Sequence, residues 1–240
     1  MLELVYWPTL QMCIWGFTTS YLLKSGNSPA AIAGGALLGG VLLWEVTLRS
    51  QMGVAITFLE ELWSRNLGHI FVSPIRPWEL IAAQITVSAM RTLFGVLPAI
   101  GLAWVLYAFD LFVMGPVLIL FFLNLMIMGW WIALAVVSLI LRHGLGAEVL
   151  AWSVTFGLAP LSAVFYPVSV LPAAIQPIAL SLPSTHVFEG MRAALLGDIR
   201  WDHLAAAAAL NIAWSLAATA LFAWQFRRAR DRGALLNLGE

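Results

Sequence analysis

The chain has 240 residues, of which 62% are hydrophobic and 10% are charged, and its formal net charge at pH 7 is zero. Soluble domains carry about 25% charged residues, and a water-soluble fold of this length has too little interior for so much apolar surface. The mean hydropathy of +0.92 therefore indicates a polytopic membrane protein. The balanced charge provides no basic patch for phosphates, so we expect no nucleic-acid partner.

Six apolar segments follow one another along the chain, and a helix needs about 20 such residues to cross a bilayer. We expect them at 5–23, 30–63, 79–108, 114–141, 147–165 and 201–226, within one transmembrane domain that covers 1–240. The sequence thus predicts an all-α polytopic membrane protein with six transmembrane helices. Glu3 stands where a signal peptide carries positive charge, so the first segment is expected to be retained as a span.

A charged stretch interrupts the apolar sequence between the second and third segments. It contains Glu60, Glu61, Trp63, Arg65, His69 and Pro74. Its polar and apolar residues mix at helical spacing, and Pro74 and Pro77 stiffen its end. This pattern favours a cytoplasmic docking helix over about 59–72 that transmits force from a soluble partner. The alternative is an ordinary interfacial helix, with Trp63 and Trp78 among the lipid headgroups.

The segment 166–198 contains apolar runs that are too short to cross the bilayer. Four prolines interrupt these runs, namely Pro167, Pro172, Pro177 and Pro183. The pattern favours a re-entrant helical hairpin, two short half-helices that dip into the outer leaflet. Backbone that breaks within a membrane must be buried in protein or face water, so we expect this segment to pack against the bundle or to line a cavity.

Arginine and lysine residues in the short loops predict the orientation. With six crossings, one side of the membrane holds Arg65, Arg76, Arg142, Arg227, Arg228, Arg230 and Arg232, whereas the other side holds Lys24, Arg192 and Arg200. The side with more positive charge is expected to be the cytoplasm. Both termini and the charged stretch at 60–79 then lie in the cytoplasm.

Several residues inside the apolar segments are candidates for a role beyond packing. Glu45 and Arg49 are four residues apart on one helix face, and charges within a membrane are normally paired. They form either a salt bridge within their helix or a polar position on a translocation route or subunit interface. Gly35 and Gly39 allow close helix contact, within one chain or across a homodimer. Trp15 is one of several deep tryptophans that either fill the core or stack along a substrate path.

Common motifs for chemistry are absent from the sequence. It has no Gly-x-x-x-x-Gly-Lys-Ser/Thr phosphate loop, no His-Glu-x-x-His zinc motif and no Gly-x-Ser-x-Gly nucleophile motif. Cys13 is the only cysteine, which excludes an internal disulfide and disfavours a cysteine-based zinc site. The four histidines lie near segment ends on different sides of the membrane, so we expect no catalytic residue and no metal site.

Two other classes of function stay open at this point. An ion-coupled carrier that acts without an ATPase needs a relay of acidic residues in the membrane, and only Glu45 is well inside a segment. A lipid-modifying enzyme at the outer face would use His186 and Glu189, which are three residues apart and share a helix face. Hydrogen bonding within the half-helix explains that pair as well.

The order of these parts resembles one family over essentially the whole chain: the permease subunits of type-2 ATP-binding cassette (ABC) exporters. Those subunits have six spans, a docking helix between the second and third spans, and two re-entrant helices before the last. The stretch 58–74 is similar to the docking helix, and Ser73-Pro74 followed by Glu79-Leu80 is similar to the pattern that follows it. The residues that are similar to the re-entrant pattern are Phe165, Tyr166, Pro167, Leu171, Pro172, Leu182, Pro183, Glu189 and Arg192.

The resemblance implies a function and a set of partners. Two permease chains, as a homodimer or a similar pair, would join two copies of a soluble ABC ATPase that binds ATP and Mg, while this chain holds no cofactor. The exported substrate would be amphipathic: a lipid, a glycolipid or polysaccharide, or a drug. The location implied is the bacterial inner membrane. Only residues 1–4 precede the first segment, where family members usually carry an amphipathic interface helix.

The residue patterns and the resemblance together assign residues to these roles. The residues expected to couple to the ATPase are Glu60, Glu61, Trp63, Arg65, His69 and Pro74. The residues expected along the translocation path or at its gate are Trp15, Glu45, Arg49, Phe165, Tyr166, Pro167, Glu189 and Arg192.

Overall fold

A computed structural model of the chain describes residues 2–24, 29–64, 77–147 and 149–231. Within these ranges the protein is all helical and contains no strand. Its long helices are α1 (Leu2–Lys24), α2 (Pro29–Trp63), α4 (Pro77–Tyr107), α5 (Val117–His143) and α9 (Trp201–Asp231). The shorter elements are η1 (Leu111–Met114), η2 (Gly144–Ala147), α6 (Val149–Leu158), η3 (Ala159–Ser162), η4 (Val168–Val170), α7 (Gln176–Leu180) and α8 (Pro183–Leu195).

Three stretches of the described residues are long and apolar enough to cross a membrane: Ile81–Tyr107, Val117–His143 and Trp201–Ala229. A helix of about 20 residues already covers the hydrocarbon thickness of a bilayer, so each of them suffices for one crossing. They lie in α4, α5 and α9. The other three crossings that the sequence predicts, in α1, α2 and α6, stay a prediction.

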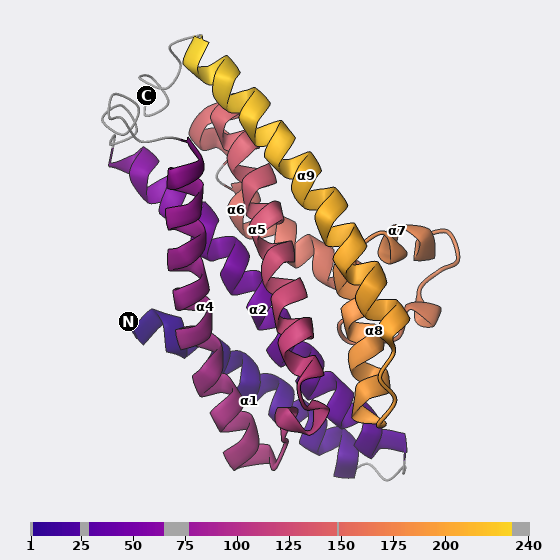
Figure 1. Ribbon diagram of the computed structural model, residues 1–240. Helices are drawn as coiled ribbons and strands as arrows, with labels where there is room; N and C mark the ends of the chain where they lie inside the picture. Colours follow the sequence, from indigo (N-terminus) through magenta and orange to yellow (C-terminus); the bar gives the residue numbers. More distant parts are fainter. Residues whose placement is uncertain (1, 25–28, 65–76, 148, 232–240) are drawn as a thin grey trace.

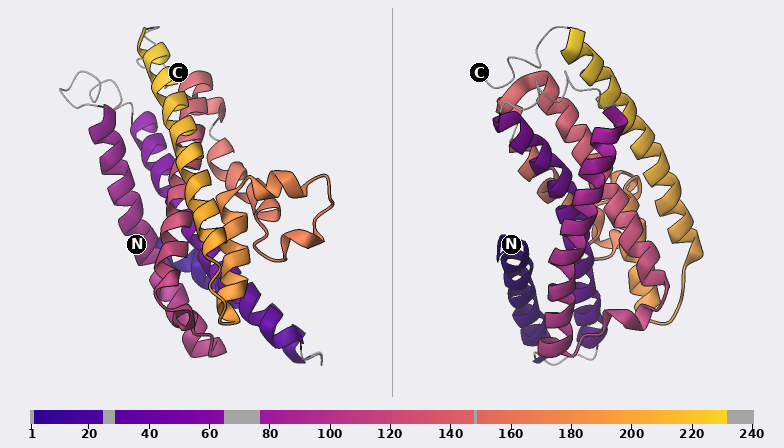
Figure 2. Two further views of the ribbon diagram at one scale, coloured as in Figure 1. Left: turned by 45° about the vertical axis from the view of Figure 1, so that its right-hand side comes forward. Right: turned by 60° about the vertical axis from the view of Figure 1, so that its left-hand side comes forward.

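Helix α2 is the central helix of the bundle. It packs against α1, α4, α5, α6 and α8, while α9 packs against α5 and α8. The end of α2, the start of α4 and the ends of α5 and α9 lie together at the top of the molecule as drawn (Figure 1), and we call this the upper end. The other two views show the same alignment, and α1 begins about midway along the bundle and runs obliquely to the lower end (Figure 2).

Close contacts between helices explain how α2 holds this position. Burial of apolar surface does not drive helices together within lipid, so small residues that let backbones approach are important. At Gly129 of α5, an added Cβ would lie 2.7 Å from the carbonyl oxygen of Thr47 in α2. At Gly53 of α2, it would lie 2.7 Å from the hydroxyl of Ser88 in α4. Glycine is therefore required at both crossings.

Gly39 also contacts residues of its own chain. A Cβ there would lie 3.2 Å from the sulfur of Met191 in α8 and 3.4 Å from the ring of Phe109. The glycine spacing predicts close packing either within one chain or across a homodimer. The contacts of Gly39 are of the first kind.

The fifth predicted segment does not continue as a helix to residue 165. Helix α6 ends at Leu158, and the turn η3 follows with Pro160 in its first positions. Proline has no N–H to donate to the preceding turn, so it ends the α-helical pattern. Ala163 then adopts the left-handed conformation with φ 54°, which turns the chain toward the segment before α8. The regular α-helix within the fifth predicted segment therefore ends at Leu158, and the crossing over 147–165 stays a prediction.

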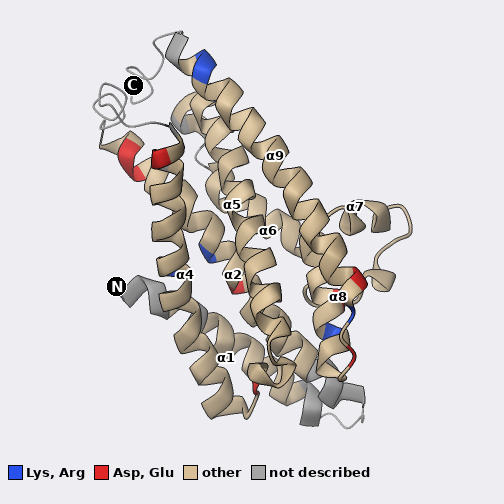
Figure 3. Cartoon of the chain, viewed as in Figure 1, with Lys and Arg blue, Asp and Glu red and all other residues tan. Residues whose placement is uncertain are grey.

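The charged stretch after α2 is described only in part. Residues Leu59 to Trp63 form the last turns of α2 itself, so the first part of the predicted docking helix continues α2 and does not begin a new element. Arg65, His69 and Pro74 lie outside the described residues. Charged residues of the described chain gather mainly near the two ends of the bundle (Figure 3).

Candidate translocation path and coupling end

A group of polar side chains lies inside the bundle where α2 meets α4, α5 and α6. We call it the polar seam, and it consists of Thr47, Ser50, Gln51, Ser88, Thr92 and Trp130. All except the half-buried Trp130 are buried. Polar groups inside a membrane protein need partners, and the residues of the seam donate hydrogen bonds to one another and to backbone carbonyls.

The hydrogen bonds of the polar seam join four helices. The Ser88 hydroxyl donates to the Ser50 carbonyl at 2.8 Å, and the Trp130 ring N–H donates to the Ser88 hydroxyl at 3.3 Å. The Gln51 amide donates to the carbonyl of Ala151 in α6 at 3.0 Å, and the Thr47 hydroxyl donates to a carbonyl of α5. Such bonds average about 0.6 kcal/mol each. Together they fix α2 against its neighbours at mid-length.

Sequence analysis did not identify the polar seam. A signal was present, because Thr47, Ser50 and Gln51 are spaced to share one face of α2. The pairing with Ser88 and Trp130 depends on which helices are neighbours, and this follows only from the three-dimensional arrangement.

The Glu45–Arg49 pair lies near the polar seam on α2. Arg49 Nε lies 3.4 Å from Glu45 Oε2, and the side chains are only 12% and 4% exposed. The Arg49 guanidinium packs directly against Gly95 of α4. A Cβ added at Gly95 would lie 2.7 Å from Arg49 Nη1. The salt bridge within one helix is therefore present. A place for the pair on a translocation route stays a prediction.

Glu189 and Arg192 form a second ion pair, which clamps α8 to the segment after η3. Glu189 Oε1 accepts a hydrogen bond from the Val168 N–H at 2.7 Å and lies 3.0 Å from Arg192 Nη2. Arg192 Nη1 donates to the Ala163 carbonyl at 2.9 Å. A residue with a Cβ is disfavoured in the left-handed conformation, so the bond to Arg192 helps to hold Ala163 there.

The Phe165-Tyr166-Pro167 sequence lies within this clamped segment. The Tyr166 hydroxyl donates to the Pro160 carbonyl at 2.7 Å and thereby closes the loop on itself. Pro167 precedes η4 in an extended conformation. Phe165 stacks on Trp15 of α1, with ring centroids 4.8 Å apart and an interplanar angle of 16°. The structure thus brings the predicted path residues together in three places: Glu45 with Arg49, Glu189 with Arg192, and Trp15 with Phe165.

Two of the four histidines meet between α8 and α9, which sequence analysis did not foresee. His186 Nδ1 lies 3.3 Å from His203 Nδ1, and His186 Nε2 lies 3.0 Å from the Leu180 carbonyl oxygen. Because that carbonyl can only accept, His186 Nε2 donates and His203 Nδ1 donates to His186 Nδ1. Glu189 makes separate contacts with Arg192 and Val168. Hydrogen bonding within the hairpin therefore accounts for His186 and Glu189.

Metal-ligand candidates do not cluster in the described part of the chain. Its residues include no group of three or more histidine, cysteine, aspartate or glutamate side chains that could hold a metal ion.

The upper end presents charged and aromatic side chains. Glu60 and Trp63 are exposed on the last turns of α2, and Trp78 is exposed on the first turn of α4. Arg227 and Arg228 are exposed near the end of α9, and the Arg228 guanidinium lies 5.0 Å from the centre of the Trp224 ring. The upper end thus carries acidic side chains, from the end of α2 and the start of α4. It also carries basic side chains, from the end of α9 (Figure 3).

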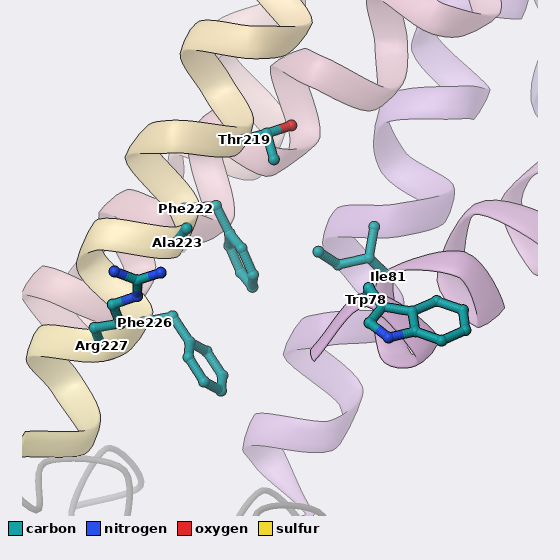
Figure 4. A pocket seen from close by; sticks show the side chains of 7 residues that line it. All are labelled: Trp78, Ile81, Thr219, Phe222, Ala223, Phe226 and Arg227. Carbon is teal, nitrogen blue, oxygen red and sulfur yellow. The ribbon is translucent and has the colours of Figure 1, made fainter. Parts of the chain in front are cut away.

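A groove of about 290 Å³ separates α4 from α9 at the upper end. Its lining consists of Trp78, Ile81, Thr219, Phe222, Ala223, Phe226 and Arg227 (Figure 4). The Phe222 and Phe226 rings, 5.8 Å apart, project from α9 toward Trp78 and Ile81 of α4 (Figure 4). We call this feature the α4–α9 groove.

Comparison with known proteins gives one family. A model of the family described as "ABC-2 family transporter protein" matches residues 18–225. The match covers α2, α4, α5, α6, α8 and most of α9. No curated protein matches the sequence.

Proposed function

The chain belongs to the ABC-2 transporter family, and we propose that it is the membrane subunit of an ATP-driven exporter. Its bundle would form the path for an amphipathic substrate, and separate ATPase subunits would bind ATP and Mg²⁺. The observation that carries this proposal is the family match over residues 18–225. The full sequence has no phosphate loop, which agrees with ATP binding on a separate chain.

Helix α2 is suited to transmit movement from the ATPase. Its last turns carry the exposed Glu60 and Trp63 at the upper end, and its middle carries Glu45, Arg49 and half of the polar seam. A shift of its end would therefore disturb contacts with α4, α5 and α6 at the same time. Coupling requires contacts that differ between two states, and we propose that Glu60, Glu61 and Trp63, with Arg65, His69 and Pro74, make such contacts with the ATPase.

The hairpin between α6 and α9 is suited to act at the end of the path that is farther from the docking stretch. Its backbone is interrupted, and the Glu189–Arg192 clamp fixes its first part, at Ala163 and Val168, to α8. The Trp15–Phe165 stack joins it to α1. We propose that Tyr166 and Pro167 lie at an outer gate, and that separation of the stacked rings accompanies opening. A lipid, a glycolipid or polysaccharide, or a drug would be suitable cargo for such an aromatic path.

The distribution of positive charge favours one of the two possible membrane orientations. Arg227 and Arg228 lie at the upper end, and Arg192 and Arg200 lie near the opposite end of α9. The larger number of basic residues on the side of the docking stretch favours a cytoplasmic upper end. We propose six crossings of the bacterial inner membrane, both termini in the cytoplasm, and a complex of two permease chains with two ATPase subunits.

The test is purification of the tagged full chain in mild detergent, followed by mass spectrometry of the proteins that accompany it. We expect a soluble protein with a phosphate-loop motif in equimolar amount. A pure, folded chain without such a protein, which transports substrate in vesicles without ATP, would instead establish an ion-coupled carrier.

A further inference from the structure

We propose that the α4–α9 groove binds an acidic phospholipid of the cytoplasmic leaflet, with one acyl chain between the helices and the phosphate at Arg227. The assignment to the cytoplasmic leaflet rests on the membrane orientation proposed above.

The depth of the groove matches one leaflet. At its mouth lie Trp78, next to the charged Glu79 on the first turn of α4, and Arg227, which directly follows the apolar sequence of α9. Along α9 it extends from Thr219 to Arg227, about 12 Å at 1.5 Å per residue. One leaflet provides about half of the roughly 30 Å hydrocarbon thickness. The groove therefore covers most of the length that an acyl chain occupies in that leaflet.

The chemistry of the lining changes along the groove. Ile81, Phe222, Ala223 and Phe226 provide the apolar part of the lining. In a bilayer, the substance that fills an apolar gap between spanning helices is hydrocarbon. A volume of about 290 Å³ is near the lower limit for small-ligand sites and is suited to part of one acyl chain.

The mouth of the groove carries the groups that recognise a headgroup. Arg227 is exposed beside the apolar lining, and a guanidinium binds phosphate oxygens through paired N–H donors. Trp78, 60% exposed, lies where tryptophan favours the headgroup region. Arg228, the next residue, lies over the Trp224 ring and does not line the groove. The selectivity for an acidic lipid is therefore assigned to Arg227.

A second copy of the chain fits the groove less well. A stable protein interface buries about 800 Å² on each partner, whereas the groove is a gap of about 290 Å³ between two helices. Arg227 at its mouth would also lie close to the Arg227 of another copy if the two grooves faced each other, and like charges repel.

The experiment compares lipid binding to the purified full chain by native mass spectrometry, with phosphatidylglycerol and phosphatidylcholine of identical acyl chains. We expect the wild type to prefer phosphatidylglycerol roughly five-fold, the usual contribution of one basic residue near an acidic membrane surface. Arg227→Gln should abolish the preference, and the matched control Arg228→Gln should keep it. Ala223→Phe, or Ala223→Leu if the larger residue prevents folding, should reduce binding of both lipids by filling the groove.

Three results would overturn the inference. Equal binding of the two lipids to the wild type would show that the headgroup is not recognised. Equal losses in the Arg227 and Arg228 variants would show a diffuse surface charge. Unchanged binding in both Ala223 variants, each folded by its thermal transition, would show that the acyl chain lies elsewhere. None of these results depends on whether an ATPase accompanies the chain, so failure here is distinguishable from failure of the proposed function.

Discussion

Arg49 of α2 fills the space that the missing side chain of Gly95 leaves on α4. A Cβ at position 95 would lie 2.7 Å from Arg49 Nη1 and 2.9 Å from its Cδ and Cζ. The guanidinium is held on its other side by Glu45, at 3.4 Å. The contact between α2 and α4 therefore depends jointly on an ion pair and on a residue without a side chain.

The first prediction concerns this contact. Gly95→Ala should displace the guanidinium and lower stability by about 1–3 kcal/mol, the usual cost of overpacking. Gly101→Ala on the same helix is the matched control, because an added Cβ there has nothing within 4 Å. The better helix propensity of alanine should leave that variant neutral or slightly more stable. Thermal unfolding in detergent measures both variants, and equal behaviour would contradict the assigned contact.

The local parts of the candidate site were predictable from the sequence. Glu45 and Arg49 are four residues apart, and Glu189 and Arg192 are three apart, so helical periodicity alone brings each pair together. The all-helical class followed from apolar segment length in the same way. The family assignment, made from the order of motifs, is confirmed by the match over residues 18–225.

Contacts between distant segments were not predictable. Arg49 meets Gly95, and Gln51 meets Ala151, only because α2 crosses α4 and α6 at particular heights. The spacing of residues within one segment carries no information about such crossings. The end of α6 was also missed, because hydropathy continues past Leu158 while Pro160 ends the helix.

The second prediction concerns the clamp on the hairpin. Arg192→Met removes the donor to the Ala163 carbonyl and leaves the partly buried Glu189 without its cation, so backbone amides near Val168 should exchange hydrogen faster. Arg200→Gln is the control, because the Arg200–Asp202 pair is exposed and such pairs contribute little. Hydrogen exchange with mass spectrometry measures the effect.

A charge swap in the clamp distinguishes the ion pair from the hydrogen bonds. In Glu189→Arg with Arg192→Glu, the opposite charges remain, but arginine at 189 has no acceptor for the Val168 N–H. We expect the double variant to stay as mobile near Val168 as Arg192→Met. Full recovery of protection would mean that charge pairing alone holds the segment.

The third prediction concerns the stacked rings of Trp15 and Phe165. A stacked pair contributes about 0.5–1.5 kcal/mol beyond the area it buries, so a double-mutant cycle with Trp15→Ala and Phe165→Ala should give a coupling energy of that size. If ring separation accompanies opening, both single variants should also change the transport rate. Trp152→Ala removes an exposed ring of α6 and is the control. Additive effects on stability would show that the stack contributes nothing of its own.

The fourth prediction concerns the docking stretch and is the sharpest test of the coupling role. Reversal of three charges, in Glu60→Lys, Glu61→Lys and Arg65→Glu, should prevent assembly with the ATPase or separate ATP hydrolysis from transport, because like charges across an interface repel. Asp198→Lys is the control, because it reverses an exposed charge in the loop between α8 and α9, far from the upper end. Co-purification and the ratio of transport to ATP hydrolysis measure the outcome. If the triple variant assembles and transports as well as the control does, the ATPase must engage another surface, and the exposed end of α2 is then an interfacial helix.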